Sequence, residues 1–148
     1  MVTFIDLLEE ATIPIVLYRP ASATTDLGLY GSSHVGILGG IIKRTNVECI
    51  LQLDLLKTDY FHADAYPTFL YYNPYSSAKT VEIDIGPEET DIYDAVTNQF
   101  LERNVRRRAQ VSIPADAARI VVLTPAGGVM RRDGKRTLIG DIVVRYTD

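Results

Sequence analysis

The feature that most constrains the fold is a succession of short apolar segments separated by turn residues, which runs from Pro67 to Tyr146. Separate strands are expected at residues 79–86 and 91–97, and in the first of them apolar and polar residues alternate, as in a strand with one face in water. Residues 120–123 are all apolar, which predicts a central strand buried on both faces. Asp133-Gly134 predicts the turn of a closing hairpin. Short strands at this spacing favour an antiparallel β-sandwich of about seven strands, which we place at residues 63–148.

Residues 1–62 differ in composition and predict a small α-rich segment, so that two domains are expected with a boundary near Phe61–Tyr66. Thr3 can cap a short amphipathic helix that ends before Pro14. An extended apolar piece then follows to Tyr18. The predicted fold is therefore mainly β with some α, with the sandwich preceded by this α-rich segment.

A second helix is expected from Ser32 or Ser33 to Arg44, with an apolar stripe along one face. It contains three glycines, and each costs about 1 kcal/mol relative to alanine inside a helix. Such a helix is stable only where a neighbour packs closely on its glycine face, as in a larger helical assembly. Residues 46–61 continue with strand-like alternation. Cys49, the single cysteine, has apolar neighbours and is expected to be buried and inert.

Composition excludes several classes of protein. The net charge of −4 argues against a general nucleic-acid binder, and the basic cluster Arg103–Arg108 is expected to be a solvated hairpin end. No apolar run reaches the about 18 residues of a membrane span, and no signal peptide is visible. As written, the chain would be cytoplasmic, an expectation that fails if it is a fragment with an upstream signal. The sequence does not decide between a fragment and a complete gene product, and it indicates no cofactor.

The sequence contains no strong catalytic or metal motif. Asp59, His62 and Asp64 could form a loop cation site, although a solvated junction loop is the simpler interpretation. Asp91 and Asp94 are three residues apart on a strand, so they should point to opposite faces and cannot form the facing carboxylate pair of a glycosidase. No catalytic residue is therefore assigned, and the chain alone is not expected to be an enzyme.

Aromatic residues are dense between Tyr60 and Tyr75, while tryptophan is absent from the chain. Flat aromatic side chains bind the C–H faces of sugar rings, and nearby polar groups fix the hydroxyls. The candidate carbohydrate-contact residues are Tyr66, Tyr72, Asn73 and Tyr75. The alternative is that these rings pack the core and the domain junction, with their hydroxyls at the rim.

The order of the β segments resembles a known family. Leu70-Tyr-Tyr-Asn-Pro74, Asp91-Ile-Tyr-Asp-Ala95 and Val111-Ser-Ile-Pro-Ala-Asp116, followed by Ile120-Val-Val-Leu123, are similar to the C-terminal β-sandwich domains of bacterial glycoside hydrolases with an (α/α)-barrel catalytic domain. Residues 1–62 resemble the last elements of such a barrel. No catalytic carboxylate of that family can be placed on this chain by a motif match.

The resemblance implies a non-catalytic ancillary domain that supports a catalytic barrel and contacts glycan. Two alternatives stay open: a stand-alone carbohydrate-binding module, and a homo-oligomeric structural or interaction protein whose glycine-rich helix packs against its own copy. The expected partners are thus a barrel domain or a second copy of the chain, with glycan as a further ligand. Neither nucleic acid nor a membrane is expected.

Overall fold

The computed structural model describes residues 36–147, and these residues are mostly β with little helix. Nine antiparallel strands form two sheets. The strands are β1 (Ile42–Arg44), β2 (Leu51–Asp54), β3 (Thr68–Asn73), β4 (Lys79–Asp94), β5 (Gln99–Ile113), β6 (Ala117–Pro125), β7 (Met130–Asp133), β8 (Arg136–Ile139) and β9 (Ile142–Tyr146).

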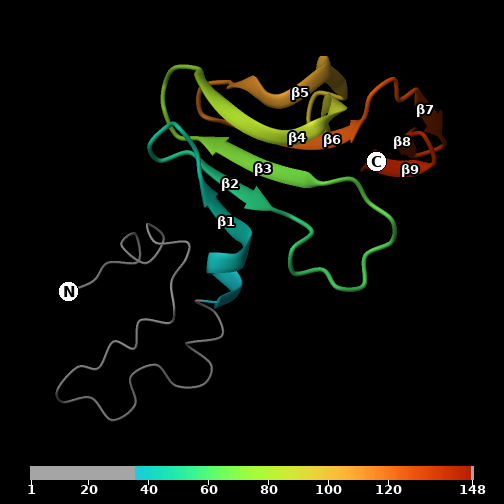
Figure 1. The fold of residues 1–148 in the computed structure, drawn as a ribbon, viewed down its shortest axis with the longest axis horizontal. Coiled ribbons are helices and arrows are strands. Elements are labelled where there is room, and N and C mark those ends of the chain that lie inside the picture. Colours follow the sequence, from blue (N-terminus) through green and yellow to red (C-terminus); the bar gives the residue numbers. More distant parts are fainter. Residues whose placement is uncertain (1–35, 148) are drawn as a thin grey trace, which may run out of the picture.

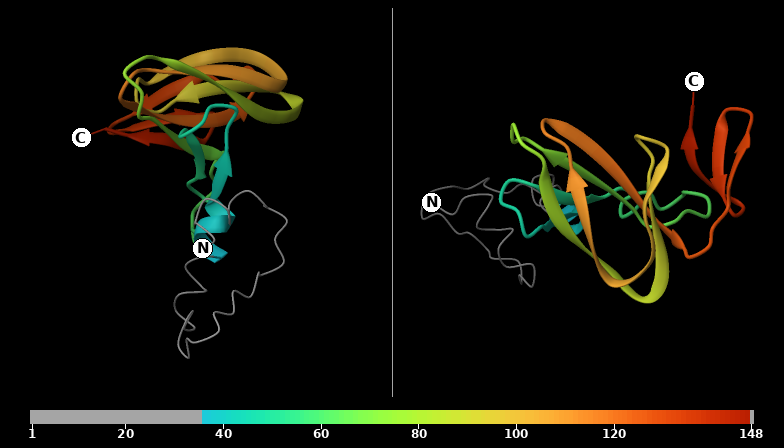
Figure 2. Two further views of the ribbon diagram at one scale, coloured as in Figure 1. Left: turned by 90° about the vertical axis from the view of Figure 1, so that its left-hand side faces the viewer. Right: turned by 90° about the horizontal axis from the view of Figure 1, so that it is seen from above.

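The main sheet has the order β1-β2-β3-β6-β4-β5, and the small sheet has the order β7-β8-β9 (Figure 1). β6 enters the main sheet last along the chain, yet it lies between β3 and β4. Its central position confirms the prediction from the apolar run at residues 120–123, of which Val121 and Val122 are buried. The small sheet lies beside one end of the main sheet, as Figure 2 shows from two further directions.

β4 and β5 are the longest strands and are strongly curved (Figure 2). The sequence predicted separate strands at residues 79–86 and 91–97, and that division is wrong. β4 continues past Gly86, which has φ +80°, and the register with β5 shifts several times between Asp84 and Tyr93. Such bulges bend a strand without ending it. The curvature brings the first half of β4 and the second half of β5 over the rest of the main sheet.

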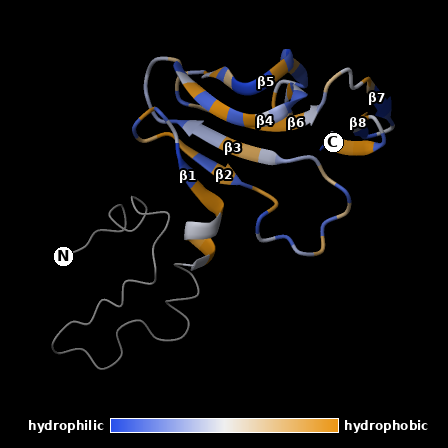
Figure 3. Ribbon diagram, in the orientation of Figure 1, coloured by the Kyte–Doolittle hydropathy of each residue, from blue (hydrophilic) through white to orange (hydrophobic). Residues whose placement is uncertain are grey.

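The larger core lies between these curved strand halves and the main sheet. It contains Tyr71 of β3, Val81 and Ile83 of β4, and Val111 and Ile113 of β5 together with other buried apolar residues. Thr80, Glu82 and Asp84 are exposed between these core residues, which confirms the predicted alternation. The hydropathy colours alternate accordingly along β4 (Figure 3).

The small sheet is fixed to the main sheet by a second, smaller core. Ile139 of β8 packs there with Tyr93 and Val122, and Tyr66 donates a hydrogen bond to the carbonyl of Ile139 at 3.1 Å. A Cβ on Gly128 would lie 2.5 Å from the Ile139 side chain, so only glycine fits at this approach. The predicted hairpin at Asp133-Gly134 is confirmed as the connection between β7 and β8.

Three expectations for the first half of the chain are wrong. The second helix does not extend to Arg44, because residues 36–41 are helical and β1 begins at Ile42. The strand expected over residues 46–61 is limited to β2. Cys49 is exposed, not buried, because it occupies a left-handed turn position with φ +61° that turns its side chain outward while Ile50 enters the core.

The helix and the extended piece predicted before Tyr18 lie outside the described residues. Within residues 36–147, β1 and β2 belong to the same sheet as β3, and seven strands follow residue 62. The described part of the chain contains no helix with the length and apolar character needed to cross a membrane.

Candidate functional site

The exposed end of β3 brings two of the candidate carbohydrate-contact residues together. Tyr72 is half exposed, and its hydroxyl donates a hydrogen bond to Oδ1 of Asp116 at 2.6 Å. The backbone N–H of Asp116 donates to the carbonyl of Tyr75 at 2.9 Å, so the β5–β6 turn ties the two tyrosines together. The ammonium of Lys79 lies 4.9 Å from the centre of the Tyr75 ring. We call Tyr72, Tyr75, Lys79 and Asp116 the tyrosine edge.

The other two candidates have different surroundings. Asn73 is fully buried, and its amide nitrogen donates to the carbonyls of Ser77, Ile113 and Pro114 while its oxygen accepts the N–H of Tyr75. All these hydrogen bonds are within the chain, so the Asn73 amide fixes the backbone next to Tyr75 instead of facing a ligand. Tyr66 precedes the opposite end of β3 and is half buried in the smaller core. The structure thus groups Tyr72 with Tyr75 and separates Tyr66 from them.

The hydroxyls of these tyrosines are held in their protonated form. The hydrogen bond to Asp116 and the charge of that carboxylate raise the pKa of Tyr72 above its ordinary value. Burial, and then the neighbouring Cys49, raise the pKa of Tyr75. The Tyr75 hydroxyl donates to the carbonyl of Glu48 at 2.9 Å. Hydrogen bonds therefore orient both hydroxyls, and the Tyr75 ring also packs against the larger core.

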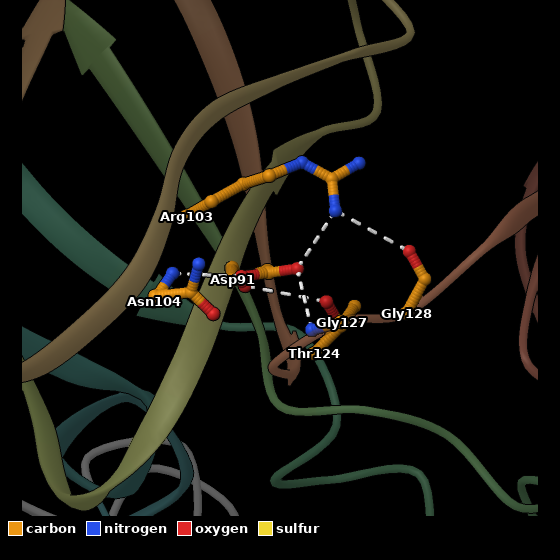
Figure 4. A network of polar contacts seen from close by, with 6 residues as sticks. All are labelled: Asp91, Arg103, Asn104, Thr124, Gly127 and Gly128. Atoms are coloured by element: carbon orange, nitrogen blue, oxygen red, sulfur yellow. Dashed lines mark hydrogen bonds and ion pairs between the residues drawn. The ribbon is translucent and has the colours of Figure 1, made fainter.

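Asp91 is fully buried and lies at the centre of a polar network (Figure 4). One carboxylate oxygen accepts the N–H of Asn104 at 2.8 Å, and the other accepts the N–H of Gly127 at 3.1 Å and Nη1 of Arg103 at 3.0 Å. Asn104 has φ +55° at an irregularity of the β4–β5 ladder, where a bulge leaves an N–H without a strand partner. Asp91 thus joins β4, β5 and the β6–β7 loop.

Asp94 is also buried, but its contacts are on the other face of β4. Its Oδ2 pairs with Nη1 of Arg119 at 2.8 Å and accepts the Thr97 hydroxyl at 2.7 Å. Its Oδ1 accepts the N–H of Val96 at 3.0 Å, which shapes the β4–β5 turn. Ile92 and Tyr93 enter different cores, which agrees with the predicted opposite orientation of Asp91 and Asp94.

These contacts leave the two buried carboxylates no free face toward a substrate. An acid–base pair must reach the reacting group within hydrogen-bond distance, and both oxygens of Asp91 and of Asp94 are already occupied by N–H or O–H groups of the chain. Their arrangement is that of structural ties between strands.

The loop proposed for a cation does not form a metal cage. Asp59 accepts the N–H of Phe61, and a ring nitrogen of His62 lies 2.6 Å from the carbonyl of Ala63. Over residues 36–147, the structure places no three His, Cys, Asp or Glu side chains where they could hold a metal ion together. Asp59, His62 and Asp64 are all exposed in this loop.

Two shallow clefts lie away from the tyrosine edge. One has a volume of about 240 Å³ on the inside of the β5 bend, between Glu102 and Arg119. The other, of about 220 Å³, separates the end of β1 from the free edge of β4. There the side-chain amide of Asn46 bonds the N–H of Glu82 and the carbonyl of Thr80, so one residue covers part of that edge. Both volumes are below the about 300–1,000 Å³ usual for ligand pockets.

Sequence reasoning missed Asp116 and Lys79 in the tyrosine edge. Asp116 is 44 residues from Tyr72, so no local spacing links the two, whereas Lys79 is close to Tyr75 along the chain but belongs to the next strand. A search for family models and a search of curated proteins give no match to this chain.

Proposed function

We propose that this chain is a non-catalytic ancillary domain of a carbohydrate-active enzyme: an antiparallel β-sandwich that supports a catalytic barrel. The observation that carries the proposal is the use of Asp91 and Asp94 as ties between strands, with every carboxylate oxygen occupied. The curvature of β4 and β5 over the main sheet supports the two-layer arrangement. The chain's contribution would be mechanical.

The tyrosine edge supports a further role in contacting glycan. Tyr72 presents a half-exposed ring whose orientation is fixed by Asp116, and Lys79 and Asp116 supply a donor and an acceptor for sugar hydroxyls. An open, exposed edge suits one or two sugar rings of a longer chain. The same features would serve a stand-alone carbohydrate-binding module.

Calorimetric titration with a panel of neutral oligosaccharides tests glycan contact. We expect weak binding that is lost in Tyr72→Ala and in Tyr75→Ala, because the first removes the half-exposed ring and the second removes the ring that Lys79 contacts. Tyr60→Ala is the matched control, since Tyr60 is 85% exposed in the loop before β3 and outside the tyrosine edge. Equal loss in the control, or no binding by the unaltered chain, would argue against glycan contact at this edge.

The supporting role has a separate test. The chain is added to an (α/α)-barrel glycoside hydrolase from which its own C-terminal β-domain has been deleted, and the melting temperature of the barrel is measured. A rise in melting temperature supports the proposal. Hydrolysis of any oligosaccharide by the purified chain alone, abolished by Asp91→Asn, would refute a non-catalytic role.

The homo-oligomeric alternative is favoured by one observation. Residues 36–40 are exposed, and a Cβ at Gly36, Gly39 or Gly40 would meet no heavy atom within 4 Å. The glycine face of this helix therefore has no neighbour among the described residues. Sedimentation equilibrium distinguishes the two proposals. A dimer that is broken by Gly39→Leu indicates self-association through this helix. A monomer supports the proposal that the glycine face packs against a barrel domain.

A further inference from the structure

The small sheet carries a group of exposed cations around its first hairpin, between β7 and β8. Arg131 and Arg132 lie on β7, Lys135 in the following turn and Arg136 at the start of β8. Among residues 36–147, no carboxylate forms an ion pair with any of these four side chains. We call them the small-sheet cations.

By contrast, four of the five arginines on β5 and β6 form an ion pair within the described part of the chain, the exception being Arg107. Arg103, Arg106, Arg108 and Arg119 contact Asp91, Glu89, Glu82 and Asp94, respectively. The small sheet has two carboxylates of its own. Asp133 is opposite Arg136 in the β7–β8 register without forming an ion pair, and Asp141 lies in the β8–β9 turn. The small-sheet cations therefore form a local positive surface on a chain whose net charge is −4.

The strand register shows which of these groups share a face. Arg136 is directly opposite Tyr146 of β9. Side-chain alternation places Arg131 on the same face as both, and Arg132 on the face that packs on the main sheet near Ile139. In Figure 3 β7 is the most hydrophilic strand of the small sheet, whereas β9 is apolar.

Exposed apolar side chains accompany the cations. Val129 is 75% exposed and Tyr146 is 72% exposed, whereas Met130 is opposite Ile139 and lies on the other face. Arginine and tyrosine are enriched in protein–protein interfaces. A nucleic acid or an acidic polysaccharide would need only the cations, so the exposed apolar side chains beside them favour an acidic protein surface as the partner.

We propose that the outer face of the small sheet docks onto an acidic protein surface. Arg131, Lys135 and Arg136 would meet its carboxylates, and Tyr146 would supply a flat apolar contact beside Arg136 on the edge strand β9. Arginine can form bidentate hydrogen bonds with carboxylates, which gives such a contact orientation as well as charge. The proposal goes beyond the supporting role above, since it holds whether or not the tyrosine edge binds glycan.

Binding to acidic polypeptides tests this docking surface. The probes are poly-glutamate and a glutamate–tyrosine copolymer of the same length, titrated into the full chain at an ionic strength of about 0.1 M. We expect both to bind and the copolymer to bind more tightly. The triple variant Arg131→Gln, Lys135→Gln, Arg136→Gln should weaken binding about tenfold or more, because it removes the three charges assigned to the docking surface.

The matched control is Arg106→Gln, Arg107→Gln, Arg108→Gln, which removes the same charge from β5. It should change the affinity by less than about twofold, since long-range charge alone is screened over about 10 Å. Tyr146→Ala should remove the advantage of the copolymer without affecting poly-glutamate. Asp133→Asn should strengthen binding of both polymers, and this gain gives a second measure if the triple variant does not fold.

Four results would overturn the proposal: equal weakening by the two triple variants, tighter binding of duplex DNA or heparin than of either polypeptide at the same ionic strength, tighter binding of anionic lipid vesicles than of either polypeptide, or no binding of the polypeptides at all. The first would indicate non-specific charge attraction. The second and third would assign the surface to a nucleic acid or polysaccharide and to a membrane, respectively.

Discussion

The arginines of β5 and those of the small sheet belong to the same chain but have opposite surroundings. On β5, Arg103, Arg106 and Arg108 each face a carboxylate of β4 across the ladder. On β7 and β8, Arg131 is opposite Leu138, and Arg136 is opposite Asp133 and Tyr146 without forming an ion pair with that carboxylate. Cross-strand pairs are the unit of sheet stabilisation, so the first set stabilises its own sheet while the second set leaves its charge for another molecule.

The ion pairs of the main sheet also differ from one another in how deeply they are buried. Within the main sheet the ion pairs range from the buried Asp94–Arg119 pair to the exposed Glu89–Arg106 pair. The energetic value of a pair should follow this burial, because exposed pairs contribute about 0–1 kcal/mol whereas removing one partner of a buried pair costs about 3–5 kcal/mol. Substitutions in ion pairs of different burial test whether the stability of the main sheet depends on these charges.

The largest effect is expected at Asp94. Asp94→Ala leaves the guanidinium of Arg119, whose side chain is 12% exposed, without its counter-charge. We expect the free energy of unfolding to fall by about 3–5 kcal/mol, measured by urea denaturation. Glu88→Ala, at an exposed position on the same strand, is the control and should change stability by less than about 0.5 kcal/mol. Similar stability of the two variants would contradict a structural role for Asp94.

Replacement of Asp91 is expected to lower the free energy of unfolding by a somewhat smaller amount. Asp91→Ala removes the acceptor of two backbone N–H groups, but its arginine partner is 46% exposed and can be solvated. Arg103 also keeps its stacking on the Phe100 ring, 3.7 Å from the ring centre. We expect a loss of about 2–3 kcal/mol, and faster amide hydrogen exchange at Asn104 and Gly127. Unchanged exchange at both residues would show that Asp91 does not hold this junction.

A direct comparison of single arginines should give small and unequal changes. Arg106→Gln breaks an exposed pair and should cost about 0.5 kcal/mol or less. Arg131→Gln breaks no pair within the described chain, so stability should stay the same or rise slightly as repulsion among the small-sheet cations falls. Thermal unfolding of the two variants side by side measures this difference. A clear loss of stability in Arg131→Gln would mean that its charge serves the fold.

The smallest effect is expected at Arg145 of the small sheet, whose charge acts on Tyr93 of the main sheet. Burial raises the pKa of Tyr93, and the nearby positive charge of Arg145 on β9 opposes that rise. Arg145→Gln should therefore raise the pKa of Tyr93 further, which a spectroscopic titration of the phenol can follow. Since the folded-state pKa is already above the ordinary value, stability is lost as the pH rises above about 10, and the variant should retain the neutral phenol to higher pH.

Much of the β architecture could be predicted from local patterns. The alternation at Lys79–Gly86 and the turn at Asp133-Gly134 are properties of a few adjacent residues, and both are confirmed. The continuity of β4 could not be predicted, because Gly86-Pro87 is a typical strand break and only the pairing with β5 shows that the chain stays extended. Cys49 was misjudged because its turn conformation depends on the contacts of Thr45 with Val47 and Ile50.

The candidate site was less predictable than the fold. Tyr72 and Tyr75 could be selected by their aromatic character, but the contact of Tyr72 with Asp116 spans 44 residues and follows from the pairing of β3 with β6. The burial of Asn73 follows from three carbonyls that meet its amide, two of them at the end of β5. Such convergence depends on tertiary structure, which short motifs do not encode.

The central position of β6 has a consequence for the order of folding. β3 and β4 are not bonded to each other as neighbours, and the strand that joins them begins only at Ala117. During synthesis, both strands therefore have an open edge until β6 has left the ribosome. Non-local pairing of this kind slows folding and exposes strand edges to other chains. A chain that stops before Ala117 should aggregate, whereas one that includes β6 can complete the main sheet.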